Sequence, residues 1–147
     1  MKLTLLALAG VFLALQAAIR LAPTDTARWH VDPVVAGDPG QAGTLQRVEV
    51  DLSPDEVLAK LANVAEATAR TTRIAGSVED GRITYRTRSF LWGFPDYTTI
   101  AATPTATGST LTILARLRFG KSDVGVNGRR VAAWLDAAGL AANPTDP

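Results

Sequence analysis

The residue types with the most scope for chemistry gather in one stretch near the end of the chain, from Arg116 to Arg130. Four of its fifteen residues are arginines, whose planar guanidinium groups bind carboxylate and phosphate oxygens in pairs. Ser122, Asp123 and Asn127 supply short polar side chains that bond to nearby backbone in turns and helix caps. We expect a strand to give way to a helix here, and the amides at the start of that helix could add to an anion site.

Four arginines from two predicted strands are expected to share one face of a sheet. Successive side chains of a strand point to opposite faces, so arginines two residues apart point the same way. If the strands pair in sequence order, both arginine pairs flank the strand of residues 96–103 and lie on the same side of the sheet. These arginines are Arg86, Arg88, Arg116 and Arg118.

The arginines and Asp96 define a candidate ligand-binding site, for which two hypotheses stay open. In the first, arginines pair with Asp96 and Asp123 and only fix the loop on the sheet. In the second, spare donors face a cleft and bind an anionic ligand, such as a lipid headgroup. The apolar loop of residues 90–95 would place Trp92 and Phe94 at the rim of that pocket. The predicted binding residues are Arg86, Arg88, Asp96, Arg116, Arg118, Ser122, Asp123, Asn127 and Arg130.

The chain has few side chains of the types that commonly act in catalysis. There is no Cys, and the only His, His30, lies in a Pro- and Gly-rich segment, where we expect it to be a surface residue. Thiolate chemistry, a Ser-His-Asp arrangement and a transition-metal site are therefore not expected, and we predict no cofactor. Asp96 and Asp123 could serve as acid and base in a hydrolase if their carboxylates met in space. We therefore assign no catalytic residue, and the sequence favours a protein that is not an enzyme.

Composition and charge limit the partners. The chain has 147 residues, of which 47% are hydrophobic and 20% charged, with a net charge of +1, which indicates one globular domain. The charge is uneven, because residues 22–81 carry a net −5 and residues 82–130 a net +6. The two parts either neutralise each other or form a basic face that attracts anions. The balanced total and the expected export argue against a nucleic-acid partner.

The first 21 residues predict a membrane anchor or a signal peptide. Lys2 is followed by an apolar run that ends before Arg20. Large residues, Gln16 or Leu15, occupy the minus-three position of either candidate cleavage site, so we favour an uncleaved anchor. Lys2 and the amino terminus favour a cytoplasmic start, which puts the domain on the periplasmic side of a bacterial inner membrane. Because a lipoprotein anchor needs a Cys, that route is excluded.

Behind this segment we predict three further parts of the chain. Residues 22–43 are rich in Pro, Gly and Asp without periodicity, which predicts a linker. Residues 44–140 show regular patterns and predict the folded domain. Residues 141–147 predict a loose tail.

The domain is predicted to be α+β. Alternation from Thr44 predicts a strand, and Ser53-Pro-Asp-Glu56 forms a capping box that begins a helix ending near Ala67. Two hairpins follow, and a last helix ends at Gly139. The predicted architecture has two layers, with strand, helix, four antiparallel strands and helix in order, and with the helices against one sheet face. The four strands are residues 71–78, 82–89, 96–103 and 110–119.

The polar stretch also carries a family resemblance. Phe94-Pro-Asp96, followed by Gly120-x-Ser-Asp-x-Gly-Val-Asn127 and Arg130, resembles the signature of the bacterial family catalogued as domain of unknown function 1499. The resemblance spans roughly residues 44–140 and implies an exported or membrane-anchored domain with no established activity. Many members of that family have a second acid where Tyr97 stands in this chain.

Three functions follow as hypotheses. The first is a membrane-anchored envelope domain that binds an anionic ligand, without catalysis, through an arginine-rich face of sheet and loop. The second is an envelope scaffold or assembly protein that acts through an exposed apolar patch around Leu91, Trp92 and Phe94. The third is a hydrolase that uses Asp96 and Asp123. The expected partners are the membrane, an anionic small molecule or lipid, and an envelope protein.

Overall fold

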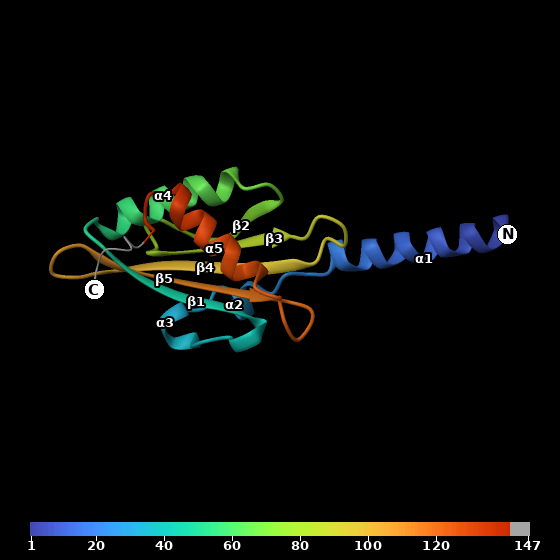
Figure 1. Cartoon of the computed structure of the whole chain (residues 1–147), viewed down its shortest axis with the longest axis horizontal. Coiled ribbons are helices and arrows are strands. Elements are labelled where there is room, and N and C mark those ends of the chain that lie inside the picture. Colours follow the sequence, from blue (N-terminus) through green and yellow to red (C-terminus); the bar gives the residue numbers. More distant parts are fainter. Residues whose placement is uncertain (142–147) are drawn as a thin grey trace.

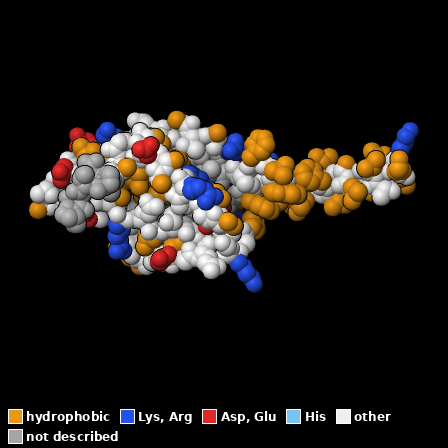
Figure 2. Space-filling model, viewed as in Figure 1, with side chains coloured by type: hydrophobic (Ala, Val, Ile, Leu, Met, Phe, Trp, Pro, Cys, Tyr) orange, Lys and Arg blue, Asp and Glu red, His pale blue; other side chains and the backbone are white. Residues whose placement is uncertain are grey.

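A single long helix projects from one end of an α+β domain in the computed structural model, which describes residues 1–141 (Figure 1). The helix, α1 (Lys2–Leu21), is long and apolar enough to cross a membrane by length and composition. Its 20 residues correspond to about 30 Å of helix, close to the thickness of a bilayer's hydrocarbon core. Hydrophobic side chains cover it in Figure 2. Of the tail predicted for residues 141–147, all but Ala141 lies outside the described residues.

The domain is built on one antiparallel sheet with the strand order β1-β5-β4-β3-β2. Strands β2 to β5 pair as neighbours in sequence order, as the predicted hairpins require, and β1 adds to the free edge of β5. Gly81, at φ +68°, makes the tight turn between β2 and β3. The strands are β1 (Gly43–Val50), β2 (Thr71–Ser77), β3 (Arg82–Arg88), β4 (Pro95–Pro104) and β5 (Ser109–Leu117).

Two helices, α4 (Pro54–Ala67) and α5 (Val126–Ala137), lie on one face of this sheet (Figure 1). The predicted capping box begins α4, since the backbone N–H of Ser53 donates to Glu56 Oε2 at 3.0 Å. The hydrophobic core lies between these helices and the sheet, and it confirms the predicted α+β fold. Its largest fully buried members include Leu58, Leu61, Tyr85, Ile100, Leu111 and Ile113.

The segment between α1 and β1 packs on the opposite face of the sheet. It forms the short helices α2 (Thr26–Trp29), α3 (Pro33–Ala36) and η1 (Gly40–Ala42). Trp29 is buried, and its ring stacks on that of Tyr97 with 4.1 Å between centroids. Helices of one turn have no periodicity to detect, so the sequence predicted only a linker here.

The end of α1 is attached to the domain through Arg88. Its Nη2 donates to the carbonyl oxygen of Arg20, in the last turn of α1, at 3.1 Å. Its Nη1 donates to the carbonyl oxygen of Gly93 at 2.9 Å. A cation at the carboxyl end of a helix is favoured, because the last carbonyl groups there have no partner within the helix.

Candidate functional site

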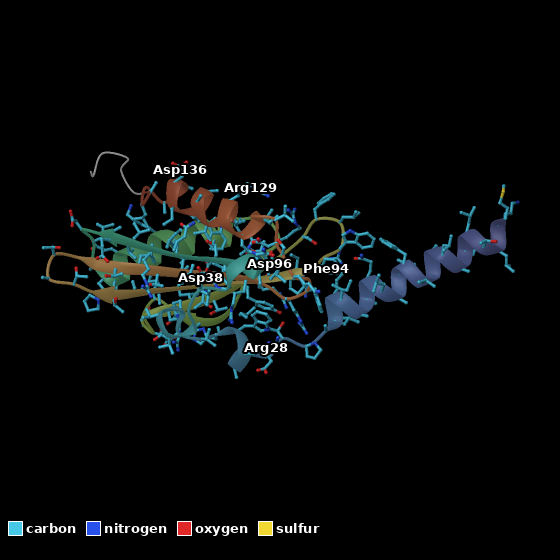
Figure 3. The ribbon with its side chains drawn as sticks, turned by 60° about the horizontal axis from the view of Figure 1, so that its bottom comes forward. Arg28, Asp38, Phe94, Asp96, Arg129 and Asp136 are labelled. Atoms are coloured by element: carbon cyan, nitrogen blue, oxygen red, sulfur yellow. The ribbon has the colours of Figure 1, made fainter. Side chains whose placement is uncertain are left out.

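The sheet divides the predicted binding residues between its two faces. Tyr97 pairs with Arg86 on one side and Arg116 on the other, so these three side chains face α2 and α3. Asp96, the preceding residue of β4, points to the helix side instead. In Figure 3, Asp96 lies between α5, which carries Arg129, and the segment that carries Arg28. We call the first group, with Arg118, the arginine face, and the second group the Asp96 pocket.

The Asp96 pocket is organised by three polar side chains that bond to one another. Asp96 Oδ2 accepts hydrogen bonds from Arg130 Nη2 at 3.0 Å and Asn127 Nδ2 at 3.2 Å. Asn127 Oδ1 in turn accepts from Arg130 Nη1 at 2.8 Å. Asn127 and Arg130 lie one turn apart on α5, so both reach the same point on the sheet. The triangle fixes the Arg130 guanidinium at the end of β4.

The ion pair between Asp96 and Arg130 is largely buried. The side chains of Arg130 and Asp96 are 12% and 18% exposed. Burial raises the pKa of the Asp96 carboxyl above its usual value, and the charge and hydrogen bonds of Arg130 oppose that rise. Removing one partner would leave the other charge without compensation in a site that excludes most of the water.

Asp123 caps the start of α5 and belongs to the loop rather than to the pocket. Its Oδ1 accepts from the Gly125 amide and its Oδ2 from the Asn127 amide, each at 2.9 Å. Burial alone would raise the pKa of Asp123, but these amides outweigh it and hold the pKa below its usual value. Ser122 Oγ accepts from the Val124 amide at 3.2 Å, in a turn where Val124 and Gly125 both have positive φ. A hydrolase that used Asp96 and Asp123 as acid and base would have to break the two hydrogen bonds by which Asp123 caps α5.

A cavity of about 300 Å³ opens beside the Asp96–Arg130 pair. Among the described residues that line it, Asp96 is the one acid, and Arg70 and Arg130 are the arginines opposite it, because the Arg88 guanidinium is bonded to the Gly93 and Arg20 carbonyl oxygens. Phe90 stands at its edge, whereas Trp92 and Phe94, the predicted rim, pack towards α1 and do not line it. The lining residues are Arg70, Thr87, Arg88, Ser89, Phe90, Asp96, Val126 and Arg130.

Arg70 is the lining residue that sequence reasoning missed. It lies between α4 and β2 with φ +60°, and its guanidinium sits 5.5 Å from the centroid of the Phe90 ring. Its Nε donates to the Arg88 carbonyl oxygen at 3.2 Å. A single arginine just before a strand fits no motif, and only the fold brings it beside Asp96.

On the arginine face, the guanidinium groups bind the chain's own amino-terminal segment. Arg116 Nη2 donates to the carbonyl oxygens of Trp29 at 3.3 Å and Arg28 at 3.4 Å, and its guanidinium lies 5.0 Å from the Trp29 ring centroid. Arg86 Nη1 donates to Thr24 Oγ1 at 3.3 Å. Burial lowers the pKa of Arg116 from its usual value. Arg118 Nη1 donates to Tyr97 Oη at 3.4 Å.

His30, expected on the surface, is half-buried on this same face. Its Nδ1 lies 2.8 Å from Thr84 Oγ1, and Arg82 Nε donates to its Nε2 at 3.4 Å. Burial, followed by the charge of Arg82, lowers the pKa of His30 from its usual value. Among residues 1–141, no group of three or more His, Asp or Glu side chains is placed to hold a metal ion.

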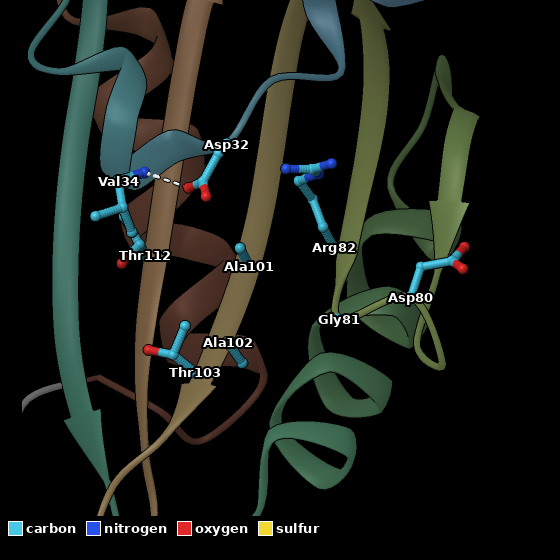
Figure 4. A pocket seen from close by; sticks show the side chains of 9 residues that line it. All are labelled: Asp32, Val34, Asp80, Gly81, Arg82, Ala101, Ala102, Thr103 and Thr112. Atoms are coloured by element: carbon cyan, nitrogen blue, oxygen red, sulfur yellow. Dashed lines mark hydrogen bonds between the residues drawn. The ribbon is translucent and has the colours of Figure 1, made fainter.

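A second cavity, of about 280 Å³, lies between α3 and the far part of the arginine-bearing sheet face (Figure 4). It is lined by Arg82 and by two acids, Asp32 and Asp80. Asp32 caps α3 by accepting from the Val34 amide at 2.8 Å, and Asp80 points away from the cavity in Figure 4. Asp32 offsets the charge of Arg82 in this cavity, so the lining has no excess of positive charge to attract an anion.

The fold and the site together define an α+β domain that carries an apolar helix at its amino terminus. A largely buried cluster of Asp96, Asn127 and Arg130 lies at one end of its sheet. The chain belongs to the family described as "Protein of unknown function (DUF1499)", whose model matches residues 21–137. The resemblance predicted from the polar stretch is thereby confirmed. A search of curated proteins found no match.

The solved structures that resemble this one include two bacterial proteins. Protein MLL2253 from Mesorhizobium loti is 11% identical, with a TM-score of 0.51, and the match covers 71% of this chain and 98% of that one. Protein CV1439 from Chromobacterium violaceum is 16% identical, with a TM-score of 0.46, over 70% of this chain and 96% of that one. At this identity, the first match supports the fold alone.

Proposed function

We propose that this chain is a membrane-anchored domain that binds an anionic group in the Asp96 pocket. The observation that carries the proposal is the cavity of about 300 Å³ in which the guanidinium groups of Arg70 and Arg130 face one acid, at the end of the sheet where α1 is attached. A site of this charge favours a phosphate or carboxylate group.

Two guanidinium groups are suited to hold the anion. Arg130 is oriented in advance by Asp96 and Asn127, so little side-chain freedom is lost when a ligand binds. Among the described residues, Arg70 is engaged through its Nε, which leaves its terminal nitrogens for a ligand. Ser89 Oγ accepts from the Phe94 amide, and its own O–H is free to donate.

The remaining predicted residues receive supporting roles in this proposal. Arg88 ties the pocket edge to α1, and Asp123 and Ser122 shape the start of α5. Arg86 and Arg116 hold the amino-terminal segment on the sheet, and Arg118 is bonded to Tyr97 of β4.

We propose that α1 lies in a bacterial inner membrane, with the domain on the periplasmic side. The length of α1 and its exposed apolar side chains support the anchor. Lys2 and the amino terminus support a cytoplasmic start. The anionic group would then belong to a lipid headgroup or to another anionic molecule of the envelope. We propose no catalytic step, because the carboxylate of Asp123 is occupied as a helix cap.

Native mass spectrometry of the full chain, extracted gently from its own membrane, tests this proposal. We expect the wild type to retain an anionic lipid or metabolite, and Arg70→Gln to lose it. The matched control is Arg47→Gln, which removes the same charge from an exposed position on the edge strand β1.

Equal retention by Arg70→Gln and the wild type would contradict the proposal. So would a bare wild-type protein, or one that carries only another protein. The last result would favour the scaffold hypothesis, for which the exposed Leu91 and Trp92 provide the apolar patch.

A further inference from the structure

The end of the domain next to α1 exposes a ridge of large apolar side chains, which we call the apolar crest. Its members come from the loop between β3 and β4 and from the residues after β5. They are Phe90, Leu91, Trp92, Phe94 and Phe119, and they are 80%, 61%, 40%, 38% and 45% exposed. A contiguous exposed patch of this kind marks a surface that binds protein or membrane.

The apolar crest is continuous with α1. Phe12 of α1 contacts Trp92, with ring centroids 5.8 Å apart. Trp92 stacks on Phe94 at 6.4 Å, and Phe94 contacts Phe119 at 5.7 Å. The row of rings therefore runs from the side of the helix across the end of the sheet. Figure 2 shows the hydrophobic surface of α1 continuing onto the end of the domain.

The position of Phe12 sets how far the crest reaches along α1. Phe12 lies nine residues before Leu21, the last residue of the helix, which is about 13 Å of helix. Trp92 therefore stands well inside the length of α1 rather than beyond its end. If the whole of α1 crosses the bilayer, Trp92 must enter the bilayer with it.

The loop is held in this exposed position by its own hydrogen bonds. The Ser89 amide donates to the Phe94 carbonyl oxygen at 2.9 Å, and the Phe94 amide donates to Ser89 Oγ at 3.0 Å. Gly93 adopts φ +71°, and a side chain there would meet the Arg20 guanidinium at 3.0 Å. The apolar residues are thus presented outward by a defined turn, instead of folding back onto the core.

Guanidinium groups flank both ends of the crest. Arg70 lies 5.5 Å from the Phe90 ring centroid, and Arg118 lies 5.2 Å from that of Phe119. Aromatic rings beside cationic side chains are typical of the membrane interface, where rings sit at headgroup level and cations meet lipid phosphates.

We infer that the apolar crest inserts into the lipid bilayer beside α1, so that the domain is seated on the membrane at two places. The inference rests on the proposed role of α1 as a membrane anchor. The occupant of the crest is lipid, because α1 brings the bilayer to the same place. Phe90 belongs to both the crest and the Asp96 pocket, so the seated domain holds that pocket at the level of the lipid phosphates.

Site-directed spin labelling of the full chain in vesicles tests this inference, and the absence of native Cys makes the labelling clean. Leu91→Cys places a label on the crest at an exposed position. Ala106→Cys is the matched control, exposed in the turn between β4 and β5 at the other end of the sheet. We expect relaxation by oxygen to dominate over relaxation by a water-soluble nickel chelate at position 91, and the reverse at position 106.

Three results are informative beside the expected one. Relaxation of the Leu91→Cys label mainly by the nickel chelate, in protein that floats with the vesicles and resists alkaline extraction, overturns the inference and leaves the anchor intact. A label shielded from both reagents overturns it in favour of a protein contact. Protein that fails to float overturns the membrane anchor and therefore this inference, whereas anion binding in the Asp96 pocket is decided by its own test.

Trp92 gives a second measurement with the native residue in place. The other two tryptophans, Trp29 and Trp134, are buried in the domain. We expect lipids brominated on the acyl chains to quench the emission of the wild-type chain and to lose most of that effect in Trp92→Phe. Equal quenching of the two proteins, or none in the wild type, would overturn the inference.

Discussion

The two faces of the sheet carry the same kinds of side chain at the same end of the domain, yet they differ in what those side chains do. On the arginine face, Arg116 lies over Trp29 and donates to backbone carbonyls of the amino-terminal segment. In the Asp96 pocket, Arg130 is held by a carboxylate and an amide and lines a cavity. The first arrangement ties chain to chain, and the second leaves room for another molecule.

The comparison shows that clustering of arginines in the sequence is a poor guide to a binding site. Strand alternation concentrates four arginines on one face, but an aromatic segment from elsewhere in the chain covers part of it. The pocket uses only one arginine of the polar stretch, Arg130, together with Arg70 from another part of the sequence. A guanidinium can bind an external ligand only where the fold leaves it beside an open cavity.

The largest expected effect comes from removing the aromatic cover of the arginine face. Trp29→Ala should lower the free energy of unfolding by about 3–5 kcal/mol, because it deletes a buried ring stacked between Tyr97 and Arg116. Urea unfolding of the full chain in detergent measures this loss. Val35→Ala, at an exposed position of α3, is the control. A loss no larger than about 0.5 kcal/mol, as for a surface substitution, would mean that the segment does not belong to the fold.

A smaller loss is expected from breaking the ion pair of the Asp96 pocket. Arg130→Met should lower the free energy of unfolding by about 2–3 kcal/mol at neutral pH, because Asp96 keeps a buried charge without its partner. The loss should shrink as the pH falls. Asp96 already has a raised pKa in the folded state, and without Arg130 that pKa rises further, so acid neutralises the stranded carboxylate.

The double variant Asp96→Asn/Arg130→Met separates the pair from the packing around it. It should recover part of the stability lost in Arg130→Met, because no unpaired charge remains. Unfolding curves at neutral and acid pH give both comparisons. A loss in Arg130→Met that does not change with pH would contradict the assigned pairing.

The cap of α5 by Asp123 should contribute less to the free energy of unfolding than Trp29 or the Asp96–Arg130 pair. Asp123→Asn should cost about 1 kcal/mol of unfolding free energy at neutral pH, because the side-chain amide keeps one acceptor but turns an NH₂ group towards the second backbone amide. The pKa of Asp123 is lowered in the folded state, so its contribution is present above the unfolded-state pKa and is lost as the pH falls through the folded-state pKa. The variant and the wild type should therefore converge in acid. A constant difference across this range would argue against the charge of Asp123 as the source.

Arg70→Gln should have the smallest effect on stability and the most selective effect on binding. Arg70 is exposed, so its replacement should change the free energy of unfolding by no more than about 0.5 kcal/mol. Retention of the anionic ligand should nevertheless fall. Native mass spectra and unfolding curves of the same preparation measure both quantities, and a variant that loses stability without losing ligand would reverse the assignment.

Local patterns were enough to predict the five strands and the two long helices of the domain, but not the short helices α2, α3 and η1. Alternation marked each strand, and Ser53 and Gly139 marked the ends of helices, because these signals depend on neighbours in the sequence. Alternation also predicted that Arg86 and Arg116 share a face, and the register through Tyr97 bears this out.

The candidate site was harder to predict, because its parts meet only in three dimensions. Asp96 and Tyr97 are adjacent in sequence, but their side chains lie on opposite faces of the sheet. The alternation of residues does not indicate which of the two faces is accessible to a ligand. The cover of the arginine face depends on Trp29, which lies far from β4 in the chain. Arg70 carries no motif, and its role depends on the packing of loops around it.

The most direct test of the central claim compares the two groups of arginines in one experiment. Inorganic phosphate, and then a soluble glycerophosphate, is titrated into the isotope-labelled full chain in detergent, and the side-chain N–H signals of arginine and asparagine are followed by NMR. We predict saturable shifts for Arg70, Arg130 and Asn127, with Arg86 and Arg116 unchanged. Saturable shifts at Arg116 without shifts at Arg130, or no saturable shift at either, would contradict the assignment of the Asp96 pocket as the anion site.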